Sequence, residues 1–109
     1  MTASPTEPRI PIDKERIAAF CQKWKIVEFS LFGSVLTDNF RPQSDVDVMV
    51  EFAADAHWGM WDLYDMEEDL KAICGRKVDL MTRRSIAKSE NYLMRNSILS
   101  GARTLYAAR

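Results

Sequence analysis

Two aspartates, Asp45 and Asp47, stand two positions apart at the start of an apolar run that ends at Phe52. Successive side chains of a β-strand point to opposite faces, so both carboxylates are expected on one face, about 7 Å apart along the strand. The three valines that alternate with them would point into a core. Carboxylates crowded in this way repel one another and lose solvation unless a hard cation holds them. The spacing therefore indicates a site for a divalent cation such as Mg²⁺.

A third aspartate, Asp79, alternates with apolar residues in the run Lys77–Thr82, which predicts another strand. If that strand pairs beside the first, three carboxylates could hold one or two Mg²⁺ ions, which would also take phosphate oxygens. Two such ions would sit about 4 Å apart, one activating a hydroxyl nucleophile and one steadying the leaving phosphates. The plainer alternative is an exposed edge strand, with Asp45 capping a turn beside Ser44. Aspartate is disfavoured in strands, however, and two on one face are unusual.

A glycine and a serine, Gly33 and Ser34, follow the strand predicted over Ile26–Phe32. Glycine permits a sharp turn and lets backbone N–H groups approach an anion with no Cβ between them. Ser34 would open one helical turn, whose N-terminus favours negative charge, and its hydroxyl can donate to a phosphate oxygen. Taken alone, the pair is more simply a turn. Beside the three aspartates, it favours a phosphate-binding site.

The elements that must position these residues alternate between helical and strand periodicity. Asp13 is expected to cap a first helix, Gly75 to end a second one, and Gly101 to end a single C-terminal helical region. The fold class is predicted as α/β (α+β), a mixed β-sheet with helices packed on it. Residues 1–12 are expected to form a flexible N-terminal arm, and residues 13–109 a single domain. The predicted strands span 26–32, 46–52, 77–82 and 103–106, and the later helices span about 61–74 and 85–99.

Composition narrows the function classes. The chain has 109 residues with a net charge of -1, so we expect one domain and no direct nucleic-acid binding. His57 is the only histidine, which argues against a zinc site or a histidine-based hydrolase. Cys21 and Cys74 lack metal-ligand spacing and are expected as reduced thiols. With no secretory leader and no long apolar run, we expect a cytoplasmic protein without membrane association.

Two surface features were open to more than one interpretation. Trp58, Met60 and Trp61 cluster at the entrance of a helix; core packing is the expected role, and a surface for a partner or for adenine is the alternative. The acidic residues of the same helix are expected to be solvated, and less often to form a docking site. They are Asp62, Asp65, Glu67, Glu68 and Asp69.

The motifs together resemble the nucleotidyltransferase superfamily. The resemblance rests on Leu31–Ser34, on Arg41–Val50 and on Gly75–Leu80, and the short chain is similar to the minimal nucleotidyltransferase (MNT) domains. It implies a polymerase-β-like fold. It also implies that Gly33 and Ser34 hold the triphosphate, that Asp45 and Asp47 bind both metal ions, and that Asp79 completes the first metal site. In that family the counterpart of Asp79 helps to deprotonate the attacking hydroxyl.

The same resemblance implies a function. Many MNT domains are antitoxins paired with a HEPN-domain toxin, and the best understood transfer AMP from ATP to a tyrosine of the toxin, silencing its RNase activity. The expected function is therefore a protein adenylyltransferase that uses ATP and Mg²⁺, with a HEPN toxin as acceptor and partner. One departure is that Val35 and Thr37 occupy positions where many relatives carry arginines. Phosphate charge would then be met by metal ions, backbone amides and Arg41.

Two other functions stay open. The chain could be an antitoxin that inhibits its partner by stoichiometric binding and carries a vestigial site. It could also modify a small molecule, as aminoglycoside nucleotidyltransferases do, although 109 residues leave little chain for an acceptor pocket.

Overall fold

The computed structural model describes residues 10–37, 40–41 and 43–108, and its centre is a four-stranded sheet with the order β3-β2-β1-β4. Strand β1 pairs antiparallel with both β2 and β4, whereas β2 and β3 run parallel. The predicted mixed sheet is therefore confirmed, with β4 as an edge strand. The strands are β1 (Ile26–Phe32), β2 (Val46–Phe52), β3 (Val78–Thr82) and β4 (Arg103–Ala107).

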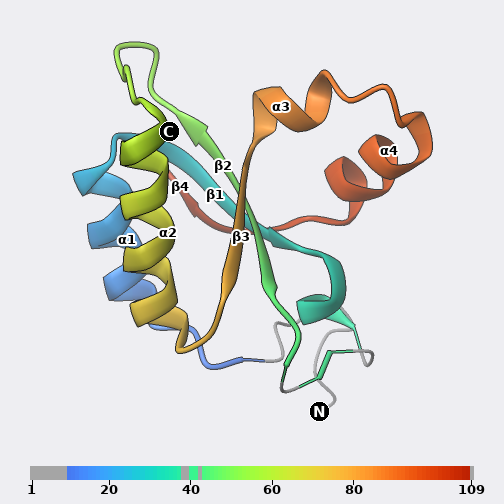
Figure 1. Ribbon diagram of the computed structural model, residues 1–109, viewed down its shortest axis with the longest axis horizontal. Coiled ribbons are helices and arrows are strands. Elements are labelled where there is room, and N and C mark those ends of the chain that lie inside the picture. Colours follow the sequence, from blue (N-terminus) through green and yellow to red (C-terminus); the bar gives the residue numbers. More distant parts are fainter. Residues whose placement is uncertain (1–9, 38–39, 42, 109) are drawn as a thin grey trace.

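The helices lie on both sides of this sheet (Figure 1). Helices α1 (Lys14–Lys23) and α2 (Met60–Cys74) cover one face, and α3 (Arg83–Ala87) and α4 (Tyr92–Gly101) lie on the other side. A single 3₁₀ turn, η1 (Gly33–Leu36), follows β1 directly and confirms the helical turn predicted there.

Alternation along β2 divides its side chains between the two faces. Val46, Val48 and Val50 are fully buried in the main core, on the side of α1 and α2. Met49 packs on the opposite side in a smaller cluster with Phe32 and Ile86. Because side chains alternate along a strand, the aspartates at 45 and 47 lie on the same side as Met49, facing α3 and α4.

The helix boundaries follow local signals in the sequence. The carboxylate of Asp13 accepts a hydrogen bond from the amide of Arg16 at 3.2 Å, so it caps α1 as expected. Gly75 ends α2 in the left-handed conformation, with φ of 73°. The inward stripe of α2 contains the fully buried Met66 and Leu70, as the helical periodicity predicts.

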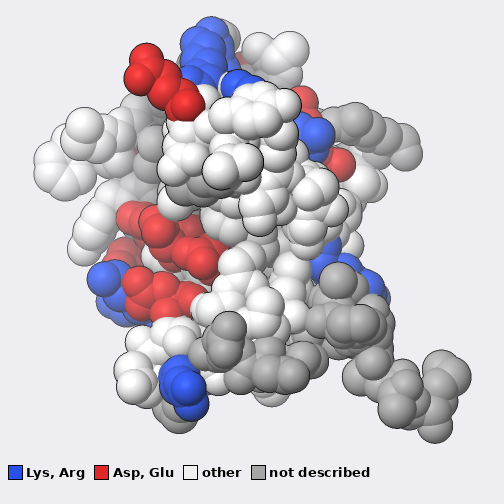
Figure 2. All heavy atoms as spheres, turned by 90° about the vertical axis from the view of Figure 1, so that its right-hand side faces the viewer, with Lys and Arg blue, Asp and Glu red and all other residues white. Residues whose placement is uncertain are grey.

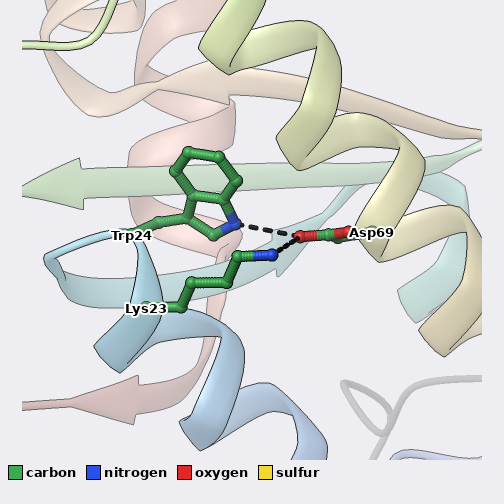
Figure 3. A network of polar contacts seen from close by, with 3 residues as sticks. All are labelled: Lys23, Trp24 and Asp69. Carbon is green, nitrogen blue, oxygen red and sulfur yellow. Dashed lines mark hydrogen bonds and ion pairs between the residues drawn. The ribbon is translucent and has the colours of Figure 1, made fainter.

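Helices α1 and α2 are joined by one acidic side chain (Figure 3). Lys23 Nζ and the Trp24 indole N–H both donate to Asp69 Oδ2, at 2.9 and 3.1 Å. Burial alone would raise the pKa of Asp69, but these two hydrogen bonds and the charge of Lys23 lower it below its usual value. Asp69, expected as part of a solvated acidic surface, therefore links the two helices.

The C-terminal helical region differs from the prediction. A single helix over 85–99 was expected, but α3 ends at Ala87 and α4 begins at Tyr92. The amide of Ser89 donates to the carbonyl of Ile86, a tighter i→i+3 closure, and Ser89 Oγ accepts from the amide of Asn91 at 3.2 Å. Serine side chains that bond nearby amides compete with helix formation, which explains the break.

The expected core packing of the whole Trp58, Met60 and Trp61 cluster is wrong for two of its members. Trp58 is half-buried; its indole meets the Trp24 ring edge-on, 5.1 Å between centroids, and donates to the Trp24 carbonyl at 2.8 Å. Met60 and Trp61 are 84% and 81% exposed. Trp61 stands two positions before the inward-facing Leu63, about 200° around the helix, and so points outward.

Most of the expected N-terminal arm lies outside the described residues. Within the described part, Ile10 is buried and joins the main core. The division between an arm over 1–12 and a domain over 13–109 therefore stays a prediction. Across the described ranges, no helix is both long and apolar enough to cross a membrane. Both cysteines are free thiols, and burial raises the pKa of Cys21 to about 12.

Candidate active site

Two of the three predicted aspartates lie side by side on neighbouring strands. In the parallel pairing of β2 with β3, Asp47 and Asp79 are direct partners in the register. Asp45 stands one residue before β2, where the amide of Val46 donates to the carbonyl of Lys77 at 3.0 Å. The three aspartates therefore meet at one end of the β2–β3 pair, on the face toward α3 and α4.

The electrostatics of Asp47 show how close these carboxylates are. Its partial burial raises its pKa above the ordinary value, and the negative charges of Asp79 and Asp45 raise it further. Each of these causes disfavours the charged form of the carboxylate. The fold thus holds Asp47 where its ionised form is costly.

One basic residue stands at the edge of this group. Lys77 Nζ lies 3.9 Å from Asp45 Oδ2, and the Lys77 side chain is 76% exposed. An ion pair this long and this exposed contributes little to stability. Lys77 is therefore free to move away from Asp45 without a large cost.

The carboxylates are neighbours, but they do not form a closed metal cage. In the part of the chain that the structure describes, no three His, Cys, Asp or Glu side chains are arranged closely enough to hold a metal ion. Asp47 and Asp79 share a register and Asp45 lies just before it, but the three side chains do not converge on one point. Their oxygen donors suit Mg²⁺, which keeps several waters and is commonly bound through only one or two carboxylates together with substrate phosphates.

Gly33 places the turn after β1 against Asp47. Its φ is +80°, a left-handed conformation that side chains rarely adopt. A Cβ built on Gly33 would collide with Asp47 Oδ2. Both facts require glycine here: the turn needs the left-handed conformation, and the Asp47 carboxylate occupies the space of a Cβ. The role of Gly33 in holding phosphate stays a prediction. The turn is closed by the amide and hydroxyl of Thr37, which donate to the carbonyl of Ser34 at 2.9 and 3.0 Å.

The described part of the loop before β2 is held by Arg76, which lies between α2 and β3. The Arg76 guanidinium lies 4.6 Å from the centre of the Phe40 ring and donates to the carbonyl of Arg41 at 3.2 Å. The amide of Arg41 donates to Ser44 Oγ at 3.0 Å. Arg76 thus positions the segment that leads to Asp45, and no local sequence signal marks this long-range contact.

A cavity of about 370 Å³ lies beside Gly33, between η1 and α4. It was not predicted, because a continuous helix over 85–99 would not have placed α4 in this position. Figure 2 looks onto the same side of the molecule, where acidic side chains gather in one patch with basic side chains at its border. The cavity is lined by Phe32, Gly33, Leu36, Thr37, Ser97, Ile98 and Gly101.

Comparisons with known proteins agree on the family. The model of the nucleotidyltransferase domain family matches residues 14–103. Two Methanocaldococcus jannaschii proteins, each named "Putative protein adenylyltransferase", are similar to the chain. The first is 38% identical over 59% of this chain and 64% of its own length. The second is 29% identical over 82% of this chain and 89% of its own length. The chain thus spans a little under two thirds of the first relative.

Solved structures show the same fold. A chain of a toxin–antitoxin complex with AMP-PNP superposes with a TM-score of 0.67, 20% identity, and coverage of 88% of this chain and 74% of the other. A structure described as a "putative minimal nucleotidyltransferase" has a TM-score of 0.63 and 25% identity, and the match covers 82% of this chain and 85% of the other. A chain from a complex of an AMPylated Shewanella oneidensis HEPN toxin with an MNT antitoxin has a TM-score of 0.58 and 21% identity, and the match covers 86% of this chain and 69% of the other. The chain therefore belongs to the nucleotidyltransferase domain family, and its fold is that of the minimal nucleotidyltransferases.

Proposed function

We propose that this chain is a nucleotidyltransferase that moves AMP from ATP onto a tyrosine hydroxyl of a HEPN-domain toxin, and so acts as its antitoxin. The observation that carries the proposal is the pairing of Asp47 with Asp79 in register, with the Gly33 turn pressed against Asp47. Carboxylates and an open backbone turn meet there within one small region. This is the combination that a metal-assisted reaction of a nucleoside triphosphate needs.

Asp45, Asp47 and Asp79 are the residues that would hold Mg²⁺. The fit rests on their oxygen donors and on the raised pKa of Asp47, which shows a crowded anionic site that a cation would relieve. Bound Mg²⁺ would neutralise charge on the phosphates and lower the pKa of the attacking hydroxyl. Because the three side chains do not converge in the structure, small rotamer changes would accompany binding.

The residues of the chain have distinct parts in the proposed reaction. The backbone at Gly33 and the Ser34 hydroxyl would hold the triphosphate in line with the acceptor. Asp79 would take the proton of the attacking tyrosine hydroxyl. The tyrosine oxygen then forms a bond to the α-phosphorus, the bond from that phosphorus to the bridging oxygen breaks, and pyrophosphate leaves. Catalysis would come mainly from positioning and charge neutralisation.

The comparisons support the choice of substrate and acceptor. The curated relatives carry names of protein adenylyltransferases, and the structural neighbours include a complex with AMP-PNP and an AMPylated HEPN toxin. Those statements concern the other proteins. They favour ATP over another nucleotide and a HEPN protein over another acceptor for this chain.

A contact antitoxin is the second candidate, and two observations favour it. Val35, which follows Ser34, is fully buried and cannot reach a phosphate, so the arginine of many relatives has no counterpart there. Met60 and Trp61 are exposed apolar side chains of the kind that protein partners cover. In this alternative the carboxylates would be remnants, and inhibition would need one antitoxin for each toxin.

One experiment separates the two candidates. The protein is incubated with Mg²⁺, ATP labelled at the α-phosphate, and the product of the gene that neighbours its own. A parallel reaction uses the Asp45→Ala/Asp47→Ala variant. We expect label on the neighbour with the wild type alone, and protection at a small fraction of the neighbour's concentration. Equal inhibition by both versions, at equimolar dose and without label, would establish the contact antitoxin instead.

A further inference from the structure

We propose that the cavity between η1 and α4 binds the nucleoside half of the nucleotide, with residues of α4 forming one of its walls. This inference deepens the proposed function and rests on it. The cavity has a volume of about 370 Å³, within the range of small-ligand sites. Nothing in the predicted catalytic residues specifies where a base would lie.

The position of the cavity is the first argument. Gly33 is one of its lining residues, and the same glycine lies against Asp47 Oδ2. A triphosphate held at Gly33 and Ser34 would thus have the carboxylates on one side and the cavity on the other. In a nucleoside triphosphate the α-phosphate joins directly to the ribose. A nucleoside joined to a triphosphate at this turn can therefore reach the cavity.

The chemistry of the walls is the second argument. No residue that lines the cavity, within the part of the chain the structure describes, carries a charge. Such a cavity suits the uncharged base and ribose and does not suit phosphates. In the proposed complex the phosphates would instead bind the η1 backbone and the cation. Phe32, Leu36 and Ile98 provide apolar surface for the faces of a base. Ser97 places a hydroxyl group at the cavity, where ribose or base-edge atoms can hydrogen-bond. The Thr37 hydroxyl, which donates to the Ser34 carbonyl, can only accept there.

The break between α3 and α4 is the third argument. Residues 88–91 turn the chain so that α4 lies on the side of η1 as a separate helix (Figure 1). Ile98 also packs with the small cluster of Phe32, Met49 and Ile86, which fixes this face of α4 against the sheet. Ser97 and Gly101 are neighbouring exposed positions at the mouth. A built Cβ on Gly101 meets no atom within 4 Å, so this wall is open to a ligand.

Filling the cavity tests the proposal. Ser97 is exposed, so Ser97→Trp adds a large ring at the mouth without replacing a core residue. Gly101→Leu fills the same space from a second position. Asn96→Trp is the matched control, because residue 96 points about 100° away on the same helix and does not line the cavity. Binding of AMP-PNP and of inorganic tripolyphosphate, each with Mg²⁺, is measured by titration calorimetry.

We expect Ser97→Trp and Gly101→Leu to weaken AMP-PNP binding about tenfold or more, and tripolyphosphate binding by no more than about twofold. Asn96→Trp should bind both probes as the wild type does. Unchanged AMP-PNP binding in both filled variants would overturn the base site while leaving the proposed transferase intact. If the wild type binds neither probe, the proposed function fails as well, and the cavity has no nucleotide to bind.

Discussion

Asp69 and Asp47 are the same residue type on opposite sides of one sheet, and their environments differ in every respect. Asp69 accepts hydrogen bonds from Lys23 and Trp24, and the net effect lowers its pKa. Asp47 is partly buried beside two further carboxylates, and its pKa is raised. The first aspartate links two helices within the protein itself. The second is the carboxylate that we propose as a ligand for the cation.

The surroundings of the two aspartates follow the same division. On the side of α1 and α2 lies the main core, with the buried valines of β2 and the inward faces of both helices. On the side of α3 and α4 the buried cluster consists of Phe32, Met49 and Ile86, and a cavity opens beside Gly33. One face of the sheet stabilises the fold, and the other is open enough to bind a ligand. Removing a side chain should therefore have opposite consequences on the two faces.

The largest expected effect is the loss of transfer in Asp47→Asn. Removing this charge should lower nucleotidyl transfer about a thousandfold or more, because the site loses a ligand for the cation that stabilises the transition state. Thermal stability without Mg²⁺ should not fall, since the change relieves repulsion from Asp79 and Asp45. Label transfer and thermal unfolding are measured on the same preparation. Transfer at the wild-type rate would show that the open face is not catalytic.

Gly33→Ala should impair both the fold and the reaction. The left-handed conformation disfavours alanine by about 1–2 kcal/mol, and the new Cβ would also displace the Asp47 carboxylate. Gly75→Ala is the matched control: its φ is +73°, but its Cβ would meet nothing within 4 Å. Denaturant unfolding should show a loss of free energy in both variants, and label transfer should fall only in Gly33→Ala. Similar transfer in the two variants would show that the close approach of Gly33 to Asp47 does not matter for the reaction.

Asp69→Asn should change stability and leave the chemistry alone. We expect the free energy of unfolding to fall by about 1 kcal/mol, because the contacts to Lys23 and Trp24 are partly exposed and lose their charge assistance. Asp65→Asn, at an exposed position of the same helix, should have almost no effect. Urea titrations of the two variants measure the difference. A loss of label transfer in Asp69→Asn would contradict the assignment of stability to one face of the sheet and of the reaction to the other.

The smallest expected effect is the pH dependence of that stability difference. A carboxylate whose pKa is lowered by folding stabilises the native state above its ordinary pKa, 3.8 for Asp69, and the effect is lost as the pH falls through the lowered value. The gap between wild type and Asp69→Asn should therefore be constant near neutral pH and close on acidification. Urea titrations across that range measure it. A gap that widens toward acid pH would contradict the lowered pKa of Asp69.

Local patterns in the sequence predicted the parts of the fold that have local causes. Alternation along β2 placed its valines and its aspartates on opposite faces, and the same alternation in β3 placed Asp79 beside them. Asp13 and Gly75 marked helix ends through capping preferences that act within a few residues. The metal and phosphate roles of the site residues came from chemistry and from family resemblance. They remain proposals.

The features that the sequence did not predict depend on residues far apart in the chain. Arg76 stacks on Phe40, and the Trp58 indole donates to the Trp24 carbonyl, over separations that no periodicity encodes. The break at Ser89 has a local cause, but the sequence does not show whether a serine side chain will bond nearby amides or point to solvent. Without that break α4 would not line the cavity. The proposed nucleoside site could therefore be found only in three dimensions.

A crystal structure of the protein with Mg²⁺ and AMP-PNP would show directly which face of the sheet holds the nucleotide. We expect metal bound by the carboxylates of Asp45 and Asp47, with Asp79 beside it, and phosphates at Gly33 and Ser34 on the side of α3 and α4. A nucleotide bound on the other face, in the groove of about 310 Å³ that Arg16, Lys23 and Asp69 help to line, would contradict this expectation.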